Sequence, residues 1–277
     1  MKWHPLNPQV LVTVLMENKF VREMRCIAGA IIFYSRIPLP SSWFSAETSH
    51  CSRYFSLVGW FVGGVCAGVW LLAQMLFSDL SWTFPEVTLQ IAVLLGMIAA
   101  VLLTGALHED GFADTCDGLG GGWTPEERLR IMKDSRIGTY GALGLVFLVL
   151  LKFFALLQIE TEILPWVWLA GHALSRFVSI SQLRFADYVQ VAAKSKSGSM
   201  TELSGVDLIV NGAFGLLPLF FIGIQVWPGL LAVVIVWWVL MIYFKRKLGG
   251  VTGDCLGATQ QLSEVVFYLG LAANFGV

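Results

Sequence analysis

Three aspartates at helical spacing are the residues of this chain best suited to chemistry. They lie in HEDGFADTCDG (108–118), where Asp110, Asp114 and Asp117 occupy positions i, i+4 and i+7. On a helix these offsets put the three carboxylates on one stripe. Clustered carboxylates repel one another, and Mg²⁺ takes carboxylate oxygens while keeping room for water or phosphate, so the stripe predicts a divalent-metal site. A solvated acidic helix end is the simpler alternative, but the apolar stretch just before the stripe argues against it.

A second group of candidate residues follows the stripe. Lys133, Asp134 and Arg136 come directly before a glycine-rich helix start at Gly138-Thr-Tyr-Gly141. Arginine forks and helix N-termini both suit phosphate oxygens. An ordinary basic cluster at a membrane interface would have the same composition, so this motif alone leaves both interpretations open.

A glycine-rich loop lies near the end of the chain. The residues GGVTGD (249–254) follow the basic run Lys245-Arg-Lys247. Backbone N–H groups in such a loop, including those of Thr252 and Gly253, can form an anion-binding nest. Asp254 adds a further candidate metal ligand. Glycine-rich loops also join many helices, so the pattern is weak by itself.

The cysteines allow a different metal. Cys116 and Cys255 flank acidic residues and, together with His108, would suit zinc. No CxxC pair accompanies them, so zinc is the less favoured metal. The five cysteines are an odd number and do not indicate a disulfide framework.

Three polar residues interrupt long apolar stretches. Arg176 lies within an apolar stretch without an evident structural reason, and an arginine within a membrane usually faces a partner or a polar cavity. Lys152 could extend its side chain to the membrane surface. His172 is more simply explained as a core histidine than as a functional one.

The composition identifies the class of protein. Of 277 residues, 56% are hydrophobic and 13% are charged, whereas a soluble domain has about 25% charged residues. The net charge of −1 gives no indication of nucleic-acid binding. We therefore expect an all-α integral membrane protein, a polytopic helix bundle.

Seven apolar stretches have the length needed to cross a membrane, about 17–25 residues. They are 54–77, 88–107, 138–157, 163–182, 207–226, 228–244 and, the weakest, 262–277. The segment 26–37 is too short to cross and runs into Pro38 and Pro40, so we expect a re-entrant or interfacial helix there. Residues 1–25 form a polar, basic segment without signal-peptide features, and 26–277 form one catalytic domain.

The basic residues favour one side of the membrane. Loops 108–137, 183–206 and 245–261 carry many Lys and Arg residues, whereas loops 78–87 and 158–162 carry none. The positive-inside rule makes the basic loops cytoplasmic. The aspartate stripe, Arg36 and the 249–254 loop then reach the same face, which permits a single composite site.

Two local patterns predict finer structure. Thr124-Pro-Glu-Glu127 has a Thr N-cap, a Pro at the first position and a Glu that closes a capping box, so we expect a short helix at about 125–134. Gly59-xxx-Gly63 and Gly64-xxx-Gly68 permit close helix packing, within the chain or between chains.

Acids in a metal-like stripe, cations and glycine-rich loops on one face describe phosphoryl-group chemistry, although the chain contains no P-loop. The stretches SRIPLP (35–40), HEDGFADTCDG (108–118), MKDSRIGTYG (132–141) and GGVTGDCLGA (249–258) resemble, in order, the motifs of the cobalamin synthase family, the adenosylcobinamide-GDP ribazoletransferases. The resemblance covers nearly the whole chain. One departure is Glu109, where the family usually has an apolar residue.

The resemblance implies a Mg²⁺-dependent transferase of a substituted phosphate group in the cytoplasmic (inner) membrane of a bacterium, with its active site on the cytoplasmic face. Its substrates would be adenosylcobinamide-GDP and α-ribazole or α-ribazole 5′-phosphate, and GMP would be released. The sequence does not identify the preferred ribazole form or the oligomeric state, and a homo-oligomer stays open.

The resemblance also implies roles for the candidate residues. The metal ligands would be Asp110, Asp114 and Asp117, completed by Asp254 or Asp134. The phosphate-binding groups would be Lys133, Arg136, Arg36, Thr252 and Gly253. His108 or an aspartate would be the general base; on an ideal helix His108 points away from the stripe, which favours an aspartate.

Two other functions compete with this interpretation. A CDP-alcohol phosphotransferase also carries an aspartate stripe, but its DG-xx-AR core is absent because Ala113 is followed by Asp114. A cation-coupled transporter would explain Arg176, but it would place its acids near mid-bilayer in repeated halves, and no halves repeat here.

Overall fold

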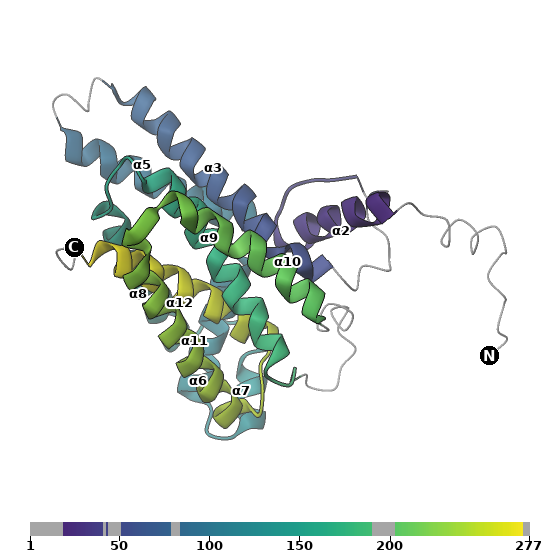
Figure 1. The fold of residues 1–277 in the computed structure, drawn as a ribbon. Helices are drawn as coiled ribbons and strands as arrows, with labels where there is room; N and C mark the ends of the chain where they lie inside the picture. The colour runs from purple at the N-terminus through teal and green to yellow at the C-terminus, as the bar shows by residue number, and fades with distance from the viewer. Residues whose placement is uncertain (1–18, 41–42, 44–50, 79–83, 190–202, 274–277) are drawn as a thin grey trace.

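The computed structural model describes residues 19–40, 43, 51–78, 84–189 and 203–273, and within these ranges every named element is a helix (Figure 1). The expected all-α fold is therefore confirmed. The elements are α2 (Lys19–Tyr34), η2 (Cys51–Tyr54), α3 (Phe55–Leu76), α5 (Pro85–Thr104), α6 (Leu107–Gly121), α7 (Pro125–Ile131), α8 (Thr139–Leu157), α9 (Leu164–Ser181), η3 (Gln182–Arg184), α10 (Gly205–Leu216), η4 (Leu217–Phe221), η5 (Gly223–Val226), α11 (Trp227–Leu248) and α12 (Gly253–Ala272).

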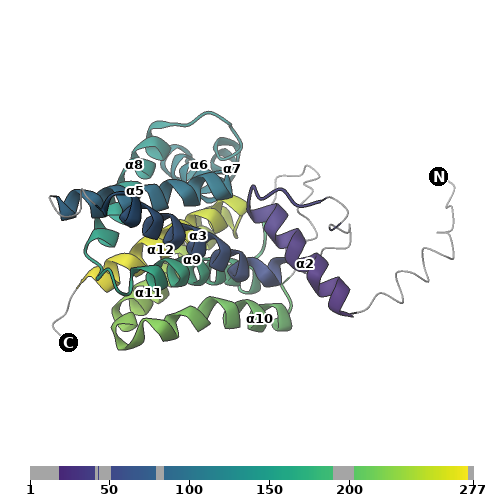
Figure 2. The same cartoon turned by 90° about the horizontal axis from the view of Figure 1, so that it is seen from above.

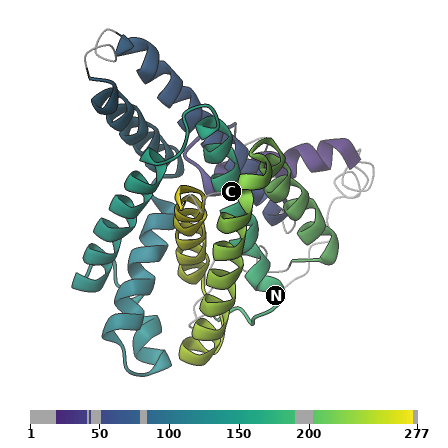
Figure 3. The ribbon, with the colours of Figure 1, turned by 60° about the vertical axis from the view of Figure 1, so that its left-hand side comes forward.

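Two central helices organise the bundle. α9 packs on α3, α10 and α12, and α12 packs on α6, α8, α9 and α11. Figure 3 shows α12 in yellow between α6 and α8 on one side and α11 on the other. Both central helices carry polar side chains that the surrounding helices cover, so their polarity is directed inward.

Four helices are long and apolar enough to cross a membrane, within the described part of the chain. They comprise Cys51–Leu76, Pro85–Thr104, Thr139–Leu157 and Gly223–Leu248, and they coincide with four of the seven predicted spans. The predicted span 163–182 is α9, whose buried His172, Ser175 and Arg176 make it less apolar.

The other two predicted spans differ in detail. Stretch 207–226 is divided into α10 and two short 3₁₀ segments, and the break follows from Pro218, which lacks a backbone donor. The helix predicted from 262 starts at Gly253 because Thr252 caps it, accepting a hydrogen bond from the backbone N–H of Cys255 at 3.2 Å. Residues 274–277 of that prediction lie outside the described residues.

The N-terminal helix is longer than predicted. The described part of α2 starts at Lys19, inside the segment 1–25 that was expected to be polar and basic, and before the helix expected at 26–37. Phe20, Val21 and Met24 alternate with charged residues there and leave an amphipathic helix. In Figure 2, α2 lies at the edge of the bundle, next to the start of α3. Residues 1–18 lie outside the described residues.

Local sequence signals at two other places behave as expected. The capping box at Thr124 and Glu127 is present and begins α7. Gly59 and Gly63 allow close packing within the chain, because a Cβ atom at either would meet the backbone of α9. Around Gly64 and Gly68 no described atom comes within 4 Å of such a Cβ.

A sharp break separates the spanning helix α5 from the stripe helix α6. Gly105 and Ala106 have φ values of 65° and 58°, and two successive left-handed residues cannot continue a helix. The helix is interrupted there, and the aspartate stripe belongs to a new helix, α6.

Candidate active site

The stripe helix and the last helix approach each other through two glycines. A Cβ atom at Gly111 would lie 3.1 Å from Asp254 Cα, and one at Gly257 would lie 3.1 Å from the carbonyl oxygen of His108. Both values are tighter than ordinary contact, so each position favours a residue without a side chain. The close approach places the stripe next to the end of the 249–254 loop, as the sequence analysis expected.

The carboxylates that meet at this contact are electrostatically crowded. Burial, Asp254 and Asp110, in that order, raise the pKa of Asp114 to about 7. Burial and the carboxylate of Asp110 raise the pKa of Asp254 to about 6, an effect that Lys133 opposes. Each shift means that negative charge is disfavoured here unless a cation offsets it.

Asp117 makes a different set of contacts from the other two aspartates of the stripe. Its side chain is buried, and its two oxygens accept hydrogen bonds from the backbone N–H groups of Gly138 at 2.7 Å and Gly141 at 2.8 Å. The carboxylate therefore caps the first turn of α8. The sequence analysis did not foresee this contact, and a metal-binding role for Asp117 stays a prediction.

The donor chemistry of the site fits Mg²⁺. Within the described ranges, no group of three or more His, Cys, Asp or Glu side chains is close enough to hold a metal ion unaided. Structural zinc requires such a group, and Cys116, Cys255 and His108 do not form one. Magnesium is commonly held by one or two carboxylates and substrate phosphates, and one or two of Asp110, Asp114 and Asp254 could supply those carboxylates.

The two predicted cations after the stripe lie in different environments. Lys133 is exposed and near enough to Asp254 to influence its pKa. The side chain of Arg136 is 87% exposed and forms an ion pair with Asp134 at 2.6 Å. Arg136 holds the pKa of Asp134 at about 2, and the pair lies on the surface. Of these three residues, Lys133 is the one whose charge acts on the pKa of a site carboxylate, that of Asp254.

Arg36 lies on another side of the stripe. It lines a cavity of about 370 Å³ together with Thr104, Gly105 and Asp110. Its backbone N–H donates to the carbonyl oxygen of Leu103 at 2.7 Å, which fixes the residue beside the α5–α6 break. The predicted grouping of Arg36 with the start of the stripe is present in the structure.

The 249–254 loop is held by a short pairing with the segment after α9. Val251 donates to the Asp187 carbonyl at 2.9 Å and accepts from the Val189 N–H at 2.8 Å. Thr252 is buried as the cap of α12, whereas Gly253 is exposed and lines a cavity shared with Asp110 and Asp254. Lys194 and Lys196 of the neighbouring predicted loop lie outside the described residues.

His108 lies at the same cavity but not among the carboxylates. Its ring is 4% exposed and has its centroid 5.6 Å from that of Phe55. Neither ring nitrogen has a hydrogen-bond partner among the described residues. The expected divergence of His108 from the stripe is consistent with this position.

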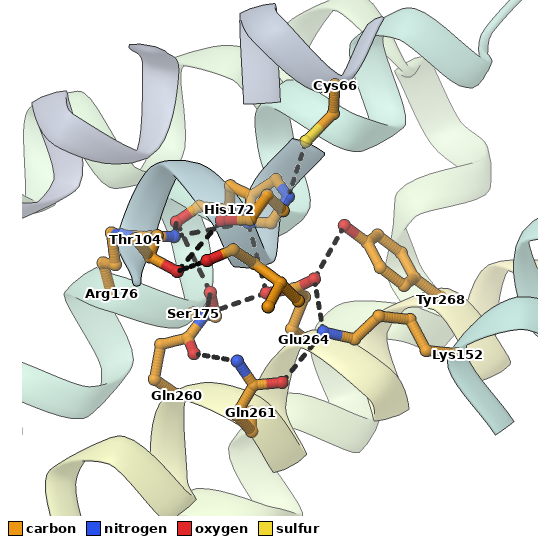
Figure 4. A network of polar contacts seen from close by, with 12 residues as sticks. Cys66, Thr104, Lys152, His172, Ser175, Arg176, Gln260, Gln261, Glu264 and Tyr268 are labelled. Atoms are coloured by element: carbon orange, nitrogen blue, oxygen red, sulfur yellow. Dashed lines mark hydrogen bonds and ion pairs between the residues drawn. The ribbon is translucent and has the colours of Figure 1, made fainter. Parts of the chain in front are cut away.

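A second polar cluster lies deeper in the bundle, and the sequence analysis found only half of it (Figure 4). Glu264 of α12 forms an ion pair with Lys152 at 2.9 Å, and its carboxylate lies 3.2 Å from His172 Nδ1. Arg176 donates to the His172 carbonyl at 2.8 Å. Arg176 and Lys152 thus have polar partners inside the bundle, as the sequence analysis required for Arg176, and the cluster is built from residues of α8, α9 and α12.

The missed half of this cluster comes from α12. Gln260 donates to Glu264 at 2.8 Å and to Ser175 at 2.9 Å, and Lys152 donates to Gln261 at 2.8 Å. Gln260, Gln261, Glu264 and Tyr268 recur at helical spacing on one face, and that periodicity is the signal that would have found them.

Glu109 belongs to this deep cluster and not to the stripe. It accepts a hydrogen bond from Gln261 Nε2 at 3.0 Å and lines a small cavity with Lys152 and Glu264. Although Glu109 immediately precedes Asp110, its side chain points into the bundle. The acid at this position therefore adds a charge next to buried cations.

Comparisons with known proteins agree on one family. A family model described as cobalamin-5-phosphate synthase matches residues 26–272. A relative from Vibrio cholerae serotype O1 is 43% identical over 250 residues, 88% of this chain and 92% of the relative. A relative from Shewanella frigidimarina is 41% identical over 273 residues, which cover 93% of this chain and 97% of the relative. A relative from Ralstonia pickettii is 40% identical over 270 residues, which cover 92% of this chain and 98% of the relative. All three are named adenosylcobinamide-GDP ribazoletransferase, and no solved structure matches the chain.

Proposed function

The chain belongs to the cobalamin-5-phosphate synthase family, and on that premise we propose that it is an adenosylcobinamide-GDP ribazoletransferase. It joins adenosylcobinamide-GDP to α-ribazole, or to α-ribazole 5′-phosphate, and releases GMP. The observation that carries this proposal is the identity of 40–43% over nearly the whole length of relatives with that name. It favours this activity over a CDP-alcohol phosphotransferase and over a transporter.

The reaction explains why acids and cations share one site. A ribose hydroxyl attacks the phosphorus that carries the corrinoid, the bond from that phosphorus to the bridging oxygen breaks, and GMP leaves with the bridging oxygen. The hydroxyl proton passes to an aspartate of the stripe. Charge develops on the bridging oxygen, so groups positioned to stabilise that charge accelerate the step.

We assign the metal to the contact between α6 and α12. One or two of the carboxylates of Asp110, Asp114 and Asp254 would hold Mg²⁺ together with substrate phosphate oxygens, and the charge of the ion would offset that of the pyrophosphate. The raised pKa values of Asp114 and Asp254 support this assignment, because crowded carboxylates gain most from a cation. Asp117 would act in a different way, by holding the first turn of α8 through the N–H groups of Gly138 and Gly141.

The phosphate-binding groups we propose are Lys133, Arg36 and the N–H groups at Thr252 and Gly253. Lys133 lies near Asp254, and Arg36 shares a cavity with Asp110. Arg136 would have to leave its ion pair with Asp134 to reach the phosphates, so its role is secondary to that of Lys133.

We place the protein in a bacterial cytoplasmic membrane with this site at the cytoplasmic face. Four apolar helices of spanning length support the membrane location. The basic residues around the site support the orientation, because such loops stay on the cytoplasmic side.

An assay of the purified protein tests the proposal. With adenosylcobinamide-GDP and α-ribazole, wild type should produce GMP and the joined corrinoid in equal amounts, and only with Mg²⁺ present. Asp110→Asn should lower the rate at least 100-fold, whereas Glu126→Gln on the exposed face of α7 should leave it unchanged. GMP release that does not depend on α-ribazole would contradict a transferase.

A further inference from the structure

A cavity of about 370 Å³ lies at the break between α5 and α6, beside the first aspartate of the stripe. Its wall is formed by the end of α2, the two residues that follow α2, the break and the start of α6. This volume is within the range of pockets that hold small-molecule ligands, about 300–1,000 Å³. The lining includes a cation, Arg36, an acid, Asp110, and an aromatic ring, Phe33. These groups suit a ligand that combines a phosphate with a flat apolar ring.

The side chain of Arg36 is exposed and is positioned by the break. A Cβ atom at Gly105 would collide with this side chain, at 2.9 Å from Arg36 Cγ, so the glycine lets the arginine lie across the break. Among the described residues, no ion pair occupies the guanidinium of Arg36. Its N–H donors are therefore available to a phosphate in the cavity.

Phe33 is an exposed aromatic ring on the charged side of α2. It follows Arg22 by eleven residues, which is about three turns, so the two side chains share one side of the helix. The Phe33 side chain is 45% exposed, and its ring meets that of Tyr34 edge-on, with centroids 4.8 Å apart. A single exposed apolar residue is ordinary on a protein surface. Phe33, however, borders the cavity, where a planar group can pack against the exposed part of its ring.

Two cavities meet at Asp110. The smaller one, which Gly253 and Asp254 line, shares Phe33, Leu107 and Asp110 with the larger one. In an in-line displacement, the attacking and leaving groups lie on opposite sides of the phosphorus. Negative charge develops on the leaving oxygen, so a cation is most useful on that side. Arg36 lines the larger cavity, whereas no described Lys or Arg lines the smaller one.

We propose that the larger cavity binds the GMP portion of adenosylcobinamide-GDP, with the Arg36 guanidinium on its phosphate and the guanine against Phe33. This inference rests on the proposed function. When the bond to the bridging oxygen breaks, that oxygen stays on the GMP phosphate, where Arg36 stabilises its charge. The attacking hydroxyl approaches from the other side of the phosphorus. The corrinoid is too large for about 370 Å³ and stays outside this cavity.

Direct binding of GMP and of guanosine to the purified protein, with Mg²⁺ present, tests the proposal. Arg36→Gln should weaken GMP binding about 30-fold and guanosine binding less than twofold, because only GMP has the phosphate. Phe33→Leu, which loses the ring, should weaken both about tenfold. Isothermal titration in detergent measures these affinities. GMP binding that is unchanged in either variant would overturn the proposal.

Two exposed positions of the same helix provide matched controls. Arg22→Gln removes a cation from α2, and Phe20→Leu removes an aromatic ring from it, and neither residue lines the cavity. Both controls should bind GMP and guanosine within twofold of wild type. A loss of GMP affinity in Arg22→Gln equal to that in Arg36→Gln would reduce the effect to general surface charge and overturn the role of Arg36.

Turnover shows which substrate the cavity serves. Phe33→Leu should raise KM for adenosylcobinamide-GDP about tenfold and change KM for α-ribazole less than twofold. Arg36→Gln should in addition lower kcat about tenfold or more, because its contact strengthens as the leaving oxygen gains charge. A rise in KM for α-ribazole alone would place the nucleoside in this cavity and overturn the assignment.

Binding and turnover together separate this inference from the proposed function. If GMP binds with the expected dependence on Arg36 and Phe33 but no product forms, the proposed function fails and the cavity assignment stands. If product forms but wild type binds GMP and guanosine equally, the phosphate contact is absent and the assignment fails alone. That last comparison uses only the wild type, so it applies even if a variant does not fold.

Discussion

Individual acidic residues of the stripe perform different tasks, although the sequence presents them as equivalent. Asp114 is crowded by other carboxylates, and Asp117 is used to cap α8. The spacing showed that the side chains share a stripe. It could not show which of them meets α12 and which meets α8, because that depends on how three helices pack.

We predict that Asp114 makes the stability of the metal-free protein depend on pH. The pKa of Asp114 is raised from 3.8 to about 7, so between those values the folded chain holds a proton that the unfolded chain has lost. The free energy of unfolding therefore falls as pH rises from about 4 to about 7. Thermal unfolding in detergent, with chelator present, measures this fall.

Two comparisons check the assignment to Asp114. Asp114→Asn should reduce the decrease in the free energy of unfolding between about pH 4 and about pH 7, whereas Glu126→Gln should leave that decrease unchanged. At pH 7.5, added Mg²⁺ should raise the free energy of unfolding of the wild type, and it should raise that of Asp114→Asn by a smaller amount. Identical pH profiles for wild type and Asp114→Asn would count against the crowding of these carboxylates.

A second prediction at this scale separates Asp117 from Asp110. Asp117→Asn leaves one acceptor for two backbone donors, so it should lower the free energy of unfolding by about 1–2 kcal/mol. Asp110→Asn should lower it by less than about 0.5 kcal/mol, because Asp110 is exposed. Both should nearly abolish turnover. Equal stability of the two variants would remove the capping role.

At the scale of helices, α12 is held to α8 and α9 by buried polar and charged contacts. Glu264 is 1% exposed and lies among Lys152, His172 and Gln260. Removing one partner of such a group leaves the opposite charge buried without compensation. The contact between these helices therefore depends on complementary side chains as well as on apolar packing.

We predict that Glu264→Gln destabilises the protein by about 3–5 kcal/mol, because Lys152 loses its buried counter-charge. The double variant Glu264→Gln with Lys152→Met should recover part of that loss. Glu160→Gln, at an exposed position, is the matched control. Thermal unfolding in detergent measures all three, and a double variant less stable than Glu264→Gln would refute the pairing.

Hydropathy was enough to find the spanning helices, because an uninterrupted apolar run of that length is typical of a helix that crosses a membrane. Hydropathy did not predict the first part of α12, because Gln260, Gln261 and Glu264 make that part polar although the helix begins at Gly253. It also failed for the start of α2, whose charged residues obscured an amphipathic pattern. Polar residues that face inward interrupt the apolar run in the sequence, and only the packing shows that the polar face is covered.

At the scale of the whole molecule, the candidate active site lies where α5, α6, α8 and α12 begin or end. The left-handed break at Gly105 and Ala106, the cap of α8 and the start of α12 all meet there. The sequence predicted that these segments share one face, because the positive-inside rule acts on whole loops. It could not predict the cavity lined by His108, because that cavity is formed by residues of α2, α3, α6, α9, η3 and α12 and by Tyr188.

The orientation gives a prediction for the whole molecule. In a Cys116→Ser background, a cysteine at Trp123 in the linker between α6 and α7 should react with an impermeant thiol reagent only in inside-out vesicles. One at Thr161, between α8 and α9, should react only in right-side-out cells. Both positions are exposed, and the remaining native cysteines are buried. The opposite labelling pattern would place the carboxylates outside.

The ion pair between Glu264 and Lys152 has a consequence for how the protein is made. Synthesis proceeds from the N-terminus, so α8 and α9, with Lys152 and Arg176, leave the ribosome well before the acid that neutralises Lys152. Until α12 arrives, the nascent chain holds these cations in the membrane without that counter-charge. A chain truncated before Gly253 should therefore stay bound to insertion factors or be degraded, which makes the last helix the one that commits the bundle to its final assembly.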